Sequence, residues 1–293
     1  MIFLGRLKDL LVRKKRFEPA GHRVSGGMAE VRLGRLVRSV IGDARVWDGL
    51  RIPDPENGGR REIDMIIARG DEVLFVEQKH WSGQLSFEDG SFLQTRRSGE
   101  ILDHGNILEW TARKGRLLGE IMEKKTGHNF GSSNVVIVFS NRGLEMEDPP
   151  EGMWVMDEMG LVELIESGNR DAPLDSVVQL MDGFGTWDTV HFRGGMALNG
   201  DIHSFGLGLD DWHDNMSGNG LIKIEHSTSW LSLITGVDSK LVALDDNRSS
   251  SLSFSGRPKL TMHVVGEKLP REIEWSNIFK IELSRIPAEW GRK

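Results

Sequence analysis

Two acidic residues and one lysine on a single predicted hairpin are the residues of this sequence best suited to chemistry. Asp64 lies in one apolar run of strand length, and Glu77 and Lys79 lie in the next. The turn sequence Arg-Gly-Asp-Glu at residues 69–72 separates the two runs, and its Gly-Asp pair tolerates the backbone of a tight turn. With a loop of two or four residues, paired positions have numbers that sum to 141, so Asp64 faces Glu77. A three-residue loop would break this register.

Opposed carboxyl groups on paired strands require an explanation. Side chains alternate across a strand, so Glu62 shares a face with Asp64 and would lie opposite Lys79. Directly opposed residues have Cβ atoms roughly 4.5–5.5 Å apart, where like charges repel. A divalent cation would remove the repulsion, because Mg²⁺ is held by a few carboxylate oxygens and completes its coordination with water and phosphate. The alternative is a solvated hairpin face, on which a Glu62–Lys79 ion pair contributes at most about 1 kcal/mol.

A helix is predicted ahead of the hairpin, over residues 28–41. Its apolar residues form one stripe, made of Leu33, Leu36, Val37, Val40 and Ile41. Glu30 precedes Leu33 by three residues and Val37 by seven, so we expect its carboxyl group on the buried side, pointing inward near the helix start. The alternative is that Glu30 compensates the helix dipole in the first turn, which contributes about 0.3–1 kcal/mol.

The remaining elements up to residue 166 follow the order of an α/β sandwich. The expected elements are a strand at 45–52, the central hairpin, a second hairpin at 84–95, a helix at 106–124, strands at 135–139 and 153–156, and a helix at 158–166. The apolar run 135–139 is typical of a strand covered on both faces. Lys114 lies on the apolar side of its helix, where we expect it to snorkel to solvent rather than to act in catalysis.

The character of the chain changes after residue 166. Residues 167–186 are polar and contain Pro173 ahead of a short predicted helix, which is typical of a linker. From Trp187 onward, short alternating segments are separated by Gly, Asn, Asp and Ser residues, with strands expected at 221–225, 230–234, 240–244, 259–265 and 278–283. This pattern predicts a small β-barrel or β-sandwich. Its histidines lack the spacing of metal ligands, so we expect them to be structural or on the surface.

Length and composition limit what the whole protein can be. A chain of 293 residues is long enough for about two domains that each bury a core. The absence of cysteine excludes disulfides and thiolate metal sites. No apolar run approaches the roughly 20 residues of a transmembrane helix, and the first residues lack a clean signal-peptide core followed by a cleavage site. We therefore expect a cytoplasmic protein.

Positive charge is concentrated near the N-terminus. Residues 1–38 contain ten Lys or Arg and three Asp or Glu, whereas residues 39–190 contain 15 basic and 28 acidic residues. Any attraction to nucleic acid must therefore come from the N-terminal arm or from metal ions. Residues 1–17 form a predicted basic amphipathic helix. This helix could dock on the protein with its basic end in water, bind phosphate, or lie on an anionic membrane surface.

A set of motifs occurs in a defined order along the chain. Glu30 on an opening helix is followed by Glu62-Ile63-Asp64, Glu77-Gln78-Lys79 and Trp81-x-Gly83. Together these motifs resemble the nuclease-related domain (NERD) family, which looks like a branch of the PD-(D/E)xK restriction-endonuclease-like superfamily. The resemblance covers about residues 25–165.

The resemblance implies a fold, a reaction and a set of site residues. The implied fold is a restriction-endonuclease-like α/β sandwich with a central mixed sheet. Asp64 and Glu77, with the backbone carbonyl of Gln78, would bind Mg²⁺ or Mn²⁺, and Glu30 would be the acidic residue supplied by the first helix. The implied reaction is metal-assisted hydrolysis of a phosphodiester, with Lys79 orienting the nucleophile or lowering its pKa.

Two positions depart from the family pattern. Gln78 stands where the family usually has an aliphatic residue, and it faces the core, where an amide needs hydrogen-bond partners. The family often has Asn-Pro-x-x-Gln in the helix after the second hairpin, whereas this chain has Asn106-Ile-Leu-Glu-Trp110. These changes bear on the strength of the activity, because the acidic and lysine positions are retained.

We therefore expect four segments: a basic N-terminal helix (1–24), a NERD-like nuclease domain (25–166), a linker with a short helix (167–186) and a small all-β C-terminal domain (187–293). The expected function is a Mg²⁺- or Mn²⁺-dependent endonuclease acting on DNA, in DNA processing or in defence against foreign DNA. The alternative is a catalytically weak nuclease-like module for nucleic-acid binding or protein assembly, with the β domain as the surface for a protein partner. Membrane contact through residues 1–17 is compatible with either function.

Overall fold

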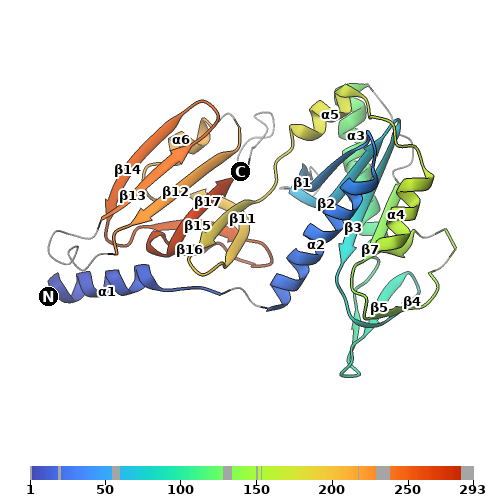
Figure 1. The fold of residues 1–293 in the computed structure, drawn as a ribbon, viewed down its shortest axis with the longest axis horizontal. Coiled ribbons are helices and arrows are strands. Elements are labelled where there is room, and N and C mark those ends of the chain that lie inside the picture. The colour runs from blue at the N-terminus through green and yellow to red at the C-terminus, as the bar shows by residue number, and fades with distance from the viewer. Residues whose placement is uncertain are drawn as a thin grey trace. The chain divides into compact units, whose positions relative to one another are not determined.

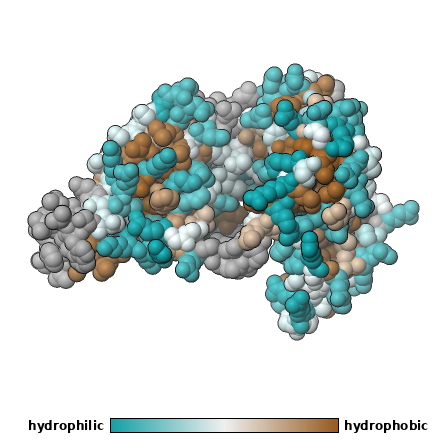
Figure 2. Space-filling view, viewed as in Figure 1, coloured by the Kyte–Doolittle hydropathy of each residue, from teal (hydrophilic) through white to brown (hydrophobic). Residues whose placement is uncertain are grey.

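The computed structural model describes residues 2–18, 21–54, 60–127, 134–149, 151–152, 154–216, 218–228 and 238–284. The chain divides into two compact units (Figure 1). The α/β unit runs from Gly21 to Gly185, and the β unit combines the N-terminal helix with the chain from Thr186 onward. Hydrophilic side chains cover much of each unit on the face seen in Figure 2, with apolar side chains between them.

A five-stranded mixed sheet forms the centre of the α/β unit. Its strand order is β1-β2-β3-β7-β9. The pairs β1–β2 and β2–β3 are antiparallel, and the pairs β3–β7 and β7–β9 are parallel. The strands are β1 (Arg45–Pro53), β2 (Arg60–Arg69), β3 (Glu72–Lys79), β7 (Asn134–Phe139) and β9 (Val155–Asp157). The mixed central sheet expected from the resemblance is therefore present.

Helices cover both faces of this sheet (Figure 1). One face carries α2 (Gly21–Val40) and α4 (Glu158–Ser167), and the other carries α3 (Ile107–Thr126) and α5 (Asp175–Asp182). The side chain of Asn106 caps α3 by accepting a hydrogen bond from the Glu109 amide at 2.9 Å.

The alternation of side chains along β3 explains why both faces are apolar. Leu74 and Val76 pack with α2 and α4, while Val73 and Phe75 pack with α3 and α5. Glu77 continues the second series, so the sheet directs its side chain toward the α3 side.

A smaller four-stranded sheet follows β3 along the chain. Its order is β6-β5-β4-β8, built from β4 (Gly83–Glu88), β5 (Ser91–Thr95), β6 (Ile101–Asp103) and β8 (Leu144–Met146). Leu85 and Phe92 of this sheet pack against Phe139 of β7. Gly83 begins β4 with a φ of 99°, and a Cβ there would lie 2.2 Å from the carbonyl oxygen of Thr95. Only glycine fits this position.

The central hairpin has the predicted register. Arg69 pairs with Glu72 and Met65 pairs with Val76, so paired numbers sum to 141 and the loop has two residues. Gly70, the first loop residue, has a φ of 54°, which glycine adopts without steric cost.

The β unit contains one eight-stranded antiparallel sheet, ordered β14-β13-β12-β17-β10-β11-β15-β16. Its strands are β10 (Asp188–Phe192), β11 (Ala197–Ser204), β12 (Gly220–His226), β13 (Asp238–Leu244), β14 (Ser249–Ser255), β15 (Lys259–Val264), β16 (Arg271–Glu274) and β17 (Ile278–Leu283). Two short helices, α6 (Asp210–Asp214) and η1 (Trp275–Asn277), join strands. Trp275 is buried in the core, and its indole N–H donates to the Phe205 carbonyl at 2.7 Å.

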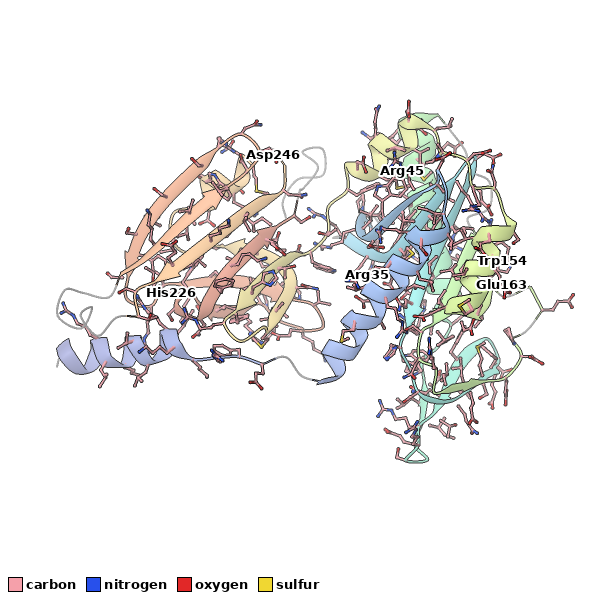
Figure 3. The ribbon with its side chains drawn as sticks, in the orientation of Figure 1. Arg35, Arg45, Trp154, Glu163, His226 and Asp246 are labelled. Atoms are coloured by element: carbon pink, nitrogen blue, oxygen red, sulfur yellow. The ribbon has the colours of Figure 1, made fainter. Side chains whose placement is uncertain are left out.

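His226 in the β unit, labelled in Figure 3, has a structural environment. Its ring nitrogens lie 2.7 Å from the Ser239 hydroxyl and 2.7 Å from the Ile278 carbonyl oxygen. Both nitrogens therefore have partners inside the sheet, which agrees with the structural role expected for it.

The N-terminal helix α1 (Ile2–Lys14) packs within the β unit. Leu10 and Arg13 are buried, and the backbone of Phe17 exchanges hydrogen bonds with Arg193 and Met196 at 2.7 and 3.0 Å. The exposed basic residues are Lys8 and, at the end of the segment, Lys14, Lys15 and Arg16. Residues 2–18 therefore dock within the β unit, with part of their basic end in solvent.

The linker expected at 167–186 is wrong for most of its length. Val177, Met181 and Phe184 are buried between the central sheet and α3, and the Trp47 indole donates to Asp182 at 2.7 Å. The stretch has a polar composition because only one face of α5 is buried, while its other face meets solvent.

Three smaller differences concern element limits. Helix α2 begins at Gly21, whereas the sequence placed its start at residue 28, after Gly26 and Gly27. Each glycine costs roughly 1 kcal/mol in a helix, which is too little to end it. The strand expected at 230–234 lies outside the described residues, as does the loop at 55–59. Among the described helices, none is long and apolar enough to cross a membrane.

Candidate active site

The β2–β3 ladder opens at the end that carries the acidic residues. Its last pair is Met65–Val76, although β3 continues to pair with β7 as far as Lys79. In the opening, Oδ2 of Asp64 accepts a hydrogen bond from the backbone N–H of Gln78 at 2.9 Å. A carboxylate oxygen therefore takes the place of a ladder carbonyl at this level of the two strands.

Glu77 lies in this opening and is buried. Its Oε1 accepts from Nζ of Lys79 at 2.5 Å, and its Oε2 accepts from Nζ of Lys114 at 2.8 Å. Two ammonium groups thus hold the two carboxylate oxygens of one acid, which stabilises the charge of Glu77 away from water.

The pKa values of the pair move in opposite directions. Burial, and then the charge of Glu77, raise the pKa of Asp64 to about 7. Burial also acts to raise the pKa of Glu77, but the charges of Lys79 and Lys114 outweigh it and hold that pKa below its usual value. Burial acts to lower the pKa of Lys79, yet the negative charges of Glu77 and Asp64 raise it above its usual value. Near neutral pH, Glu77 is ionised, Lys79 is protonated and Asp64 is poised between its two forms.

Lys114 is the site residue that sequence reasoning assigned a different role. It does not snorkel to solvent, because its ammonium ends on Glu77. Arg113 fixes this turn of α3 by donating to the buried carboxylate of Asp54 at 2.8 and 3.2 Å. The sequence contained a signal for this contact. Lys114 precedes the buried Leu118 by four residues, so it lies on the face of α3 that packs against the sheet.

Glu30 departs from its expected position. Its side chain is exposed, and the buried stripe of α2 runs through Ala29, Leu33 and Val37. At about 100° per residue, Glu30 lies about 100° from Ala29 and about 60° from Leu33, so it falls at the edge of the buried stripe and not at its centre. Partial desolvation and the charge of Glu62 nevertheless raise the pKa of Glu30, and the charge of Lys79 opposes them. Glu30 thus lies at the rim of the site, within electrostatic reach of Glu62 and Lys79.

Glu62 does not pair with Lys79. The ladder is open at that level, and Glu62 lies opposite Arg51 of β1 instead. The ion pair of a solvated hairpin face is therefore replaced by the buried Lys79–Glu77 contact.

Gln78 contributes its backbone to the site. Its N–H points to the β2 side, where it meets Asp64, and the carbonyl of the same residue points to the same side of a strand. The side chain lies on the opposite face, and its Nε2 atom is buried with no hydrogen-bond partner among the described residues. The aliphatic residue usual in the family would avoid that unpaired amide.

Aromatic rings border the site on the side of the smaller sheet. Trp81 stacks on His104 with ring centroids 3.7 Å apart, and it also contacts Phe139 at 5.5 Å. Nε2 of His104 lies 3.0 Å from the side-chain oxygen Oε1 of Gln94, which can only accept a hydrogen bond. Burial and the positive charge of Arg96 lower the pKa of His104, and the charge of Lys79 adds to this effect.

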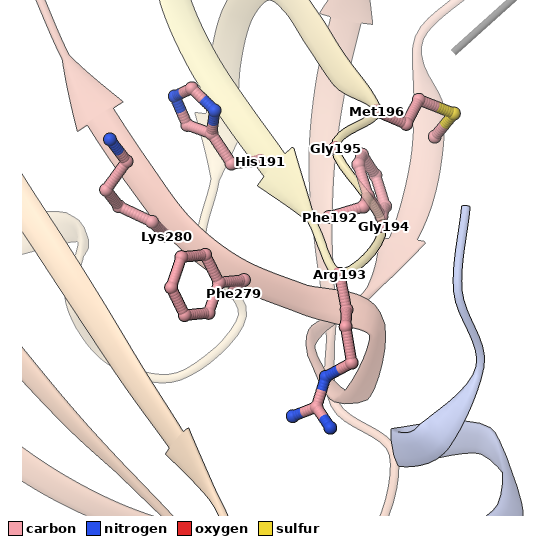
Figure 4. Close-up of a pocket in the computed structure, with 8 residues that line it drawn as sticks. All are labelled: His191, Phe192, Arg193, Gly194, Gly195, Met196, Phe279 and Lys280. Atoms are coloured by element: carbon pink, nitrogen blue, oxygen red, sulfur yellow. The ribbon is translucent and has the colours of Figure 1, made fainter. Parts of the chain in front are cut away.

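A second concave feature belongs to the β unit (Figure 4). This pocket has a volume of about 420 Å³ and is lined by His191, Phe192, Arg193, Gly194, Gly195, Met196, Phe279 and Lys280. Its lining contains basic and apolar side chains and no carboxylate. It offers no carboxylate ligand for Mg²⁺, so the opening between β2 and β3 remains the candidate active site.

The comparison with protein families agrees with this choice. Residues 25–140 match the nuclease-related domain (NERD) family. The NERD match begins in α2 and ends directly after β7. It therefore contains the acids Glu30, Asp64 and Glu77 together with Lys79 and Lys114. It confirms the resemblance carried by the motifs, and the PD-(D/E)xK superfamily is consistent with it.

A relative and a negative result complete the comparisons. The protein named probable kinase PglW, of Streptomyces coelicolor, is 26% identical over 130 residues, which are 43% of this chain and 8% of that protein. The chain thus spans less than a tenth of the length of this relative. No solved structure matches the chain.

The residues in the opening of the NERD segment suit a divalent cation by donor type. Asp64, Glu77 and the Gln78 carbonyl supply hard oxygen atoms, and Mg²⁺ is commonly held by one or two carboxylates with water in its other positions. When all are ionised, the four acids Glu30, Glu62, Asp64 and Glu77 exceed the two lysines by two negative charges. Among the described residues, no group of three or more His, Asp or Glu side chains is arranged as a ready metal site.

Proposed function

We propose that the NERD segment is a metal-dependent nuclease that hydrolyses phosphodiester bonds in DNA. The observation that carries the proposal is the opening of the β2–β3 ladder, where Asp64, Glu77 and Lys79 meet. A buried acid with a pKa near 7, beside a second acid and a lysine, is typical of functional sites rather than of cores selected only for stability. The family match supports nuclease-related chemistry.

In this proposal Asp64, Glu77 and the Gln78 carbonyl would hold Mg²⁺ or Mn²⁺. The bound cation would supply a water of lowered pKa and positive charge against the phosphate. Lys79 keeps its proton and is oriented by Glu77, so its ammonium can donate to the attacking water or to a phosphate oxygen. Glu30, at the rim with a raised pKa, can take up a proton on its carboxyl group.

The proposal extends to fold and role. We place the α/β unit among restriction-endonuclease-like sandwiches, on the basis of its mixed central sheet with helices on both faces. The role we propose is DNA processing or defence against foreign DNA.

Nicking of plasmid DNA and melting in Mn²⁺ test the proposal together. Asp64→Asn and Glu77→Gln should each reduce nicking by about 100-fold or more, because each removes charge that the reaction needs. Wild-type Tm should rise with Mn²⁺, by an amount equivalent to about 2.7 kcal/mol when Mn²⁺ is 100 times its Kd, and Asp64→Asn should lose most of this gain.

Two further variants sharpen the result. Lys79→Gln should lose most nicking, while Mn²⁺ should raise its Tm at least as much as that of the wild type, because an ammonium is not a metal ligand and competes with the metal for Glu77. Asp71→Asn, in the exposed turn of the same hairpin, is the matched control and should behave as the wild type. If Mn²⁺ does not change the Tm of the wild type and the wild type does not nick DNA, the proposed nuclease function is contradicted.

A catalytically weak module is the second candidate, and one contact favours it. The two carboxylate oxygens of Glu77 already have ammonium partners, so a metal must displace at least one of them. If nicking is absent while DNA binding survives Asp64→Asn and Glu77→Gln alike, the protein serves binding or assembly instead.

A further inference from the structure

Trp110 is a large exposed side chain at the start of α3. Its side chain is 59% exposed, although burying a tryptophan normally stabilises a fold. It is held in place from below, because a Cβ on Gly105 would lie 3.0 Å from two atoms of the indole ring. The ring therefore packs on Gly105 with much of its surface in solvent. Trp110 also occupies the position at which the family pattern often has glutamine.

The same helix connects Trp110 to the candidate site. Lys114 follows it by four residues, so the two side chains lie on one face of α3, one turn apart. Lys114 ends on Glu77 at 2.8 Å. The loop beneath Trp110 also carries His104, which stacks on Trp81 and feels the charge of Lys79. The exposed indole is thus one helical turn from Lys114, which supplies one of the two ammonium groups on Glu77.

An indole face in this position suits one kind of ligand. Aromatic side chains stack on nucleobases without regard to sequence, but only a base that is unpaired or at an end has a free face. A base stacked on Trp110 would leave its phosphate near the turn of α3 that carries Lys114. Paired bases within a duplex are covered by their neighbours and cannot use this surface.

We infer that Trp110 is a stacking surface for an unpaired base, and that the substrate class of the NERD segment is single-stranded DNA or DNA with an unpaired end. The inference rests on the proposed function for its account of cleavage, but the binding that it describes can be measured without cleavage.

Fluorescence anisotropy of labelled oligonucleotides in EDTA tests the stacking surface in the full chain. The probes are a 12-nucleotide single strand of mixed sequence and the blunt duplex that contains it. Trp110→Ala should weaken binding of the single strand by about fivefold or more and binding of the duplex by less than about twofold. Trp110→Phe, which keeps an aromatic face, should restore most of the single-strand affinity.

Two variants guard against indirect effects. Trp110→Leu keeps apolar contact over Gly105 but has no ring, so it should bind as weakly as Trp110→Ala even if the alanine variant loses stability. Phe279→Ala removes another exposed aromatic ring, 55% exposed and in the β unit, and should leave both affinities unchanged.

The outcomes separate this inference from the proposed function. A selective loss of single-strand binding in a protein that does not nick DNA supports the stacking surface and contradicts the nuclease. Equal weakening for single strand and duplex, no weakening, or a wild type that binds neither probe would overturn the stacking surface whatever the nicking assay shows.

Discussion

At the scale of single residues, the contacts of the candidate site centre on Glu77. It is buried, ionised and held by Lys79 and Lys114, while Asp64 beside it is held only weakly in its charged form. The buried acids Glu77 and Asp64 are poorly suited to a purely stabilising role. Their charge is compensated by the two lysines, and removal of either lysine would leave a buried negative charge with less compensation. The arrangement makes sense if the local charge changes when a ligand arrives.

Asp64→Asn should change how stability depends on pH. The folded protein holds a proton on Asp64 that the unfolded chain releases between pH about 4 and about 7, since the folded pKa is raised to about 7. Stability therefore falls as the pH rises through this window. Metal-free Asp64→Asn should match the wild type near pH 4 and exceed it by roughly 2–4 kcal/mol above pH 7.

Urea unfolding in EDTA at a series of pH values measures this difference. Asp71→Asn, in the exposed hairpin turn, serves as the control and should follow the wild-type curve. A constant difference between Asp64→Asn and the wild type at all pH values would show that the pKa of Asp64 is not raised.

Lys114→Gln should bind metal more tightly than the wild type. The ammonium on Oε2 of Glu77 competes with a cation, and a hydrogen bond to a charged group contributes about 1.5–3 kcal/mol. Its loss should lower the Kd for Mn²⁺ roughly tenfold, measured by titration calorimetry. Lys124→Gln, at the exposed end of α3, should leave the Kd unchanged, and a weaker metal affinity in Lys114→Gln would mean that Lys114 does not compete.

At the scale of elements, two features build the site. The β2–β3 ladder stops one pair before Asp64 and Glu77, which creates the opening, and α3 crosses that face of the sheet with Lys114 directed into it. α5 packs beside α3 and against β1, so it supports the helix that carries Lys114.

Met181→Ala tests whether residues 167–185 are part of the core. Met181 is fully buried between α5, α3 and the sheet, and loss of such a side chain typically costs 2–5 kcal/mol. Chemical unfolding followed by circular dichroism should show a loss of this size. Gln179→Ala, on the exposed face of α5, should change stability by less than about 0.5 kcal/mol, and equal effects of the two variants would restore the linker interpretation.

At the scale of the whole molecule, the N-terminal helix has two separable surfaces within the β unit. Leu10 and Arg13 are buried, whereas Lys14, Lys15 and Arg16 remain in solvent. The acidic middle of the chain repels nucleic acid, so these exposed charges are suited to attract it.

Replacing Lys14, Lys15 and Arg16 together with glutamine should flatten the salt dependence of DNA binding. Each lost phosphate contact should reduce the slope of log K against log salt by about 0.9 for duplex DNA. Filter binding from 50 to 300 mM salt measures the slope. Leu10→Ala is the opposite variant, since it should lower the Tm and leave the slope unchanged; an unchanged slope in the triple variant would mean that the helix only docks.

The sequence by itself determined the features that depend on near neighbours. The hairpin register followed from the sequence on the condition that the loop at Gly70 had two or four residues, and the structure has two. The period of two along a strand then carries the position of the turn to every paired residue. In the α/β unit, the order of the central strands and of helices α2, α3 and α4 followed from the spacing of apolar residues. These are local signals, and they placed Asp64 opposite Glu77 without knowledge of the fold.

Only the tertiary structure decided which distant elements meet. That Lys114 holds Glu77 depends on α3 covering that face of the sheet, and the exposure of Glu30 depends on how α2 is rotated against the other face. The packing of α5 and the docking of Leu10 in the β unit likewise depend on partners more than 50 residues away along the chain. An amphipathic pattern states that a face will be buried but does not name the surface that buries it, since burial depends on apolar area and not on sequence order.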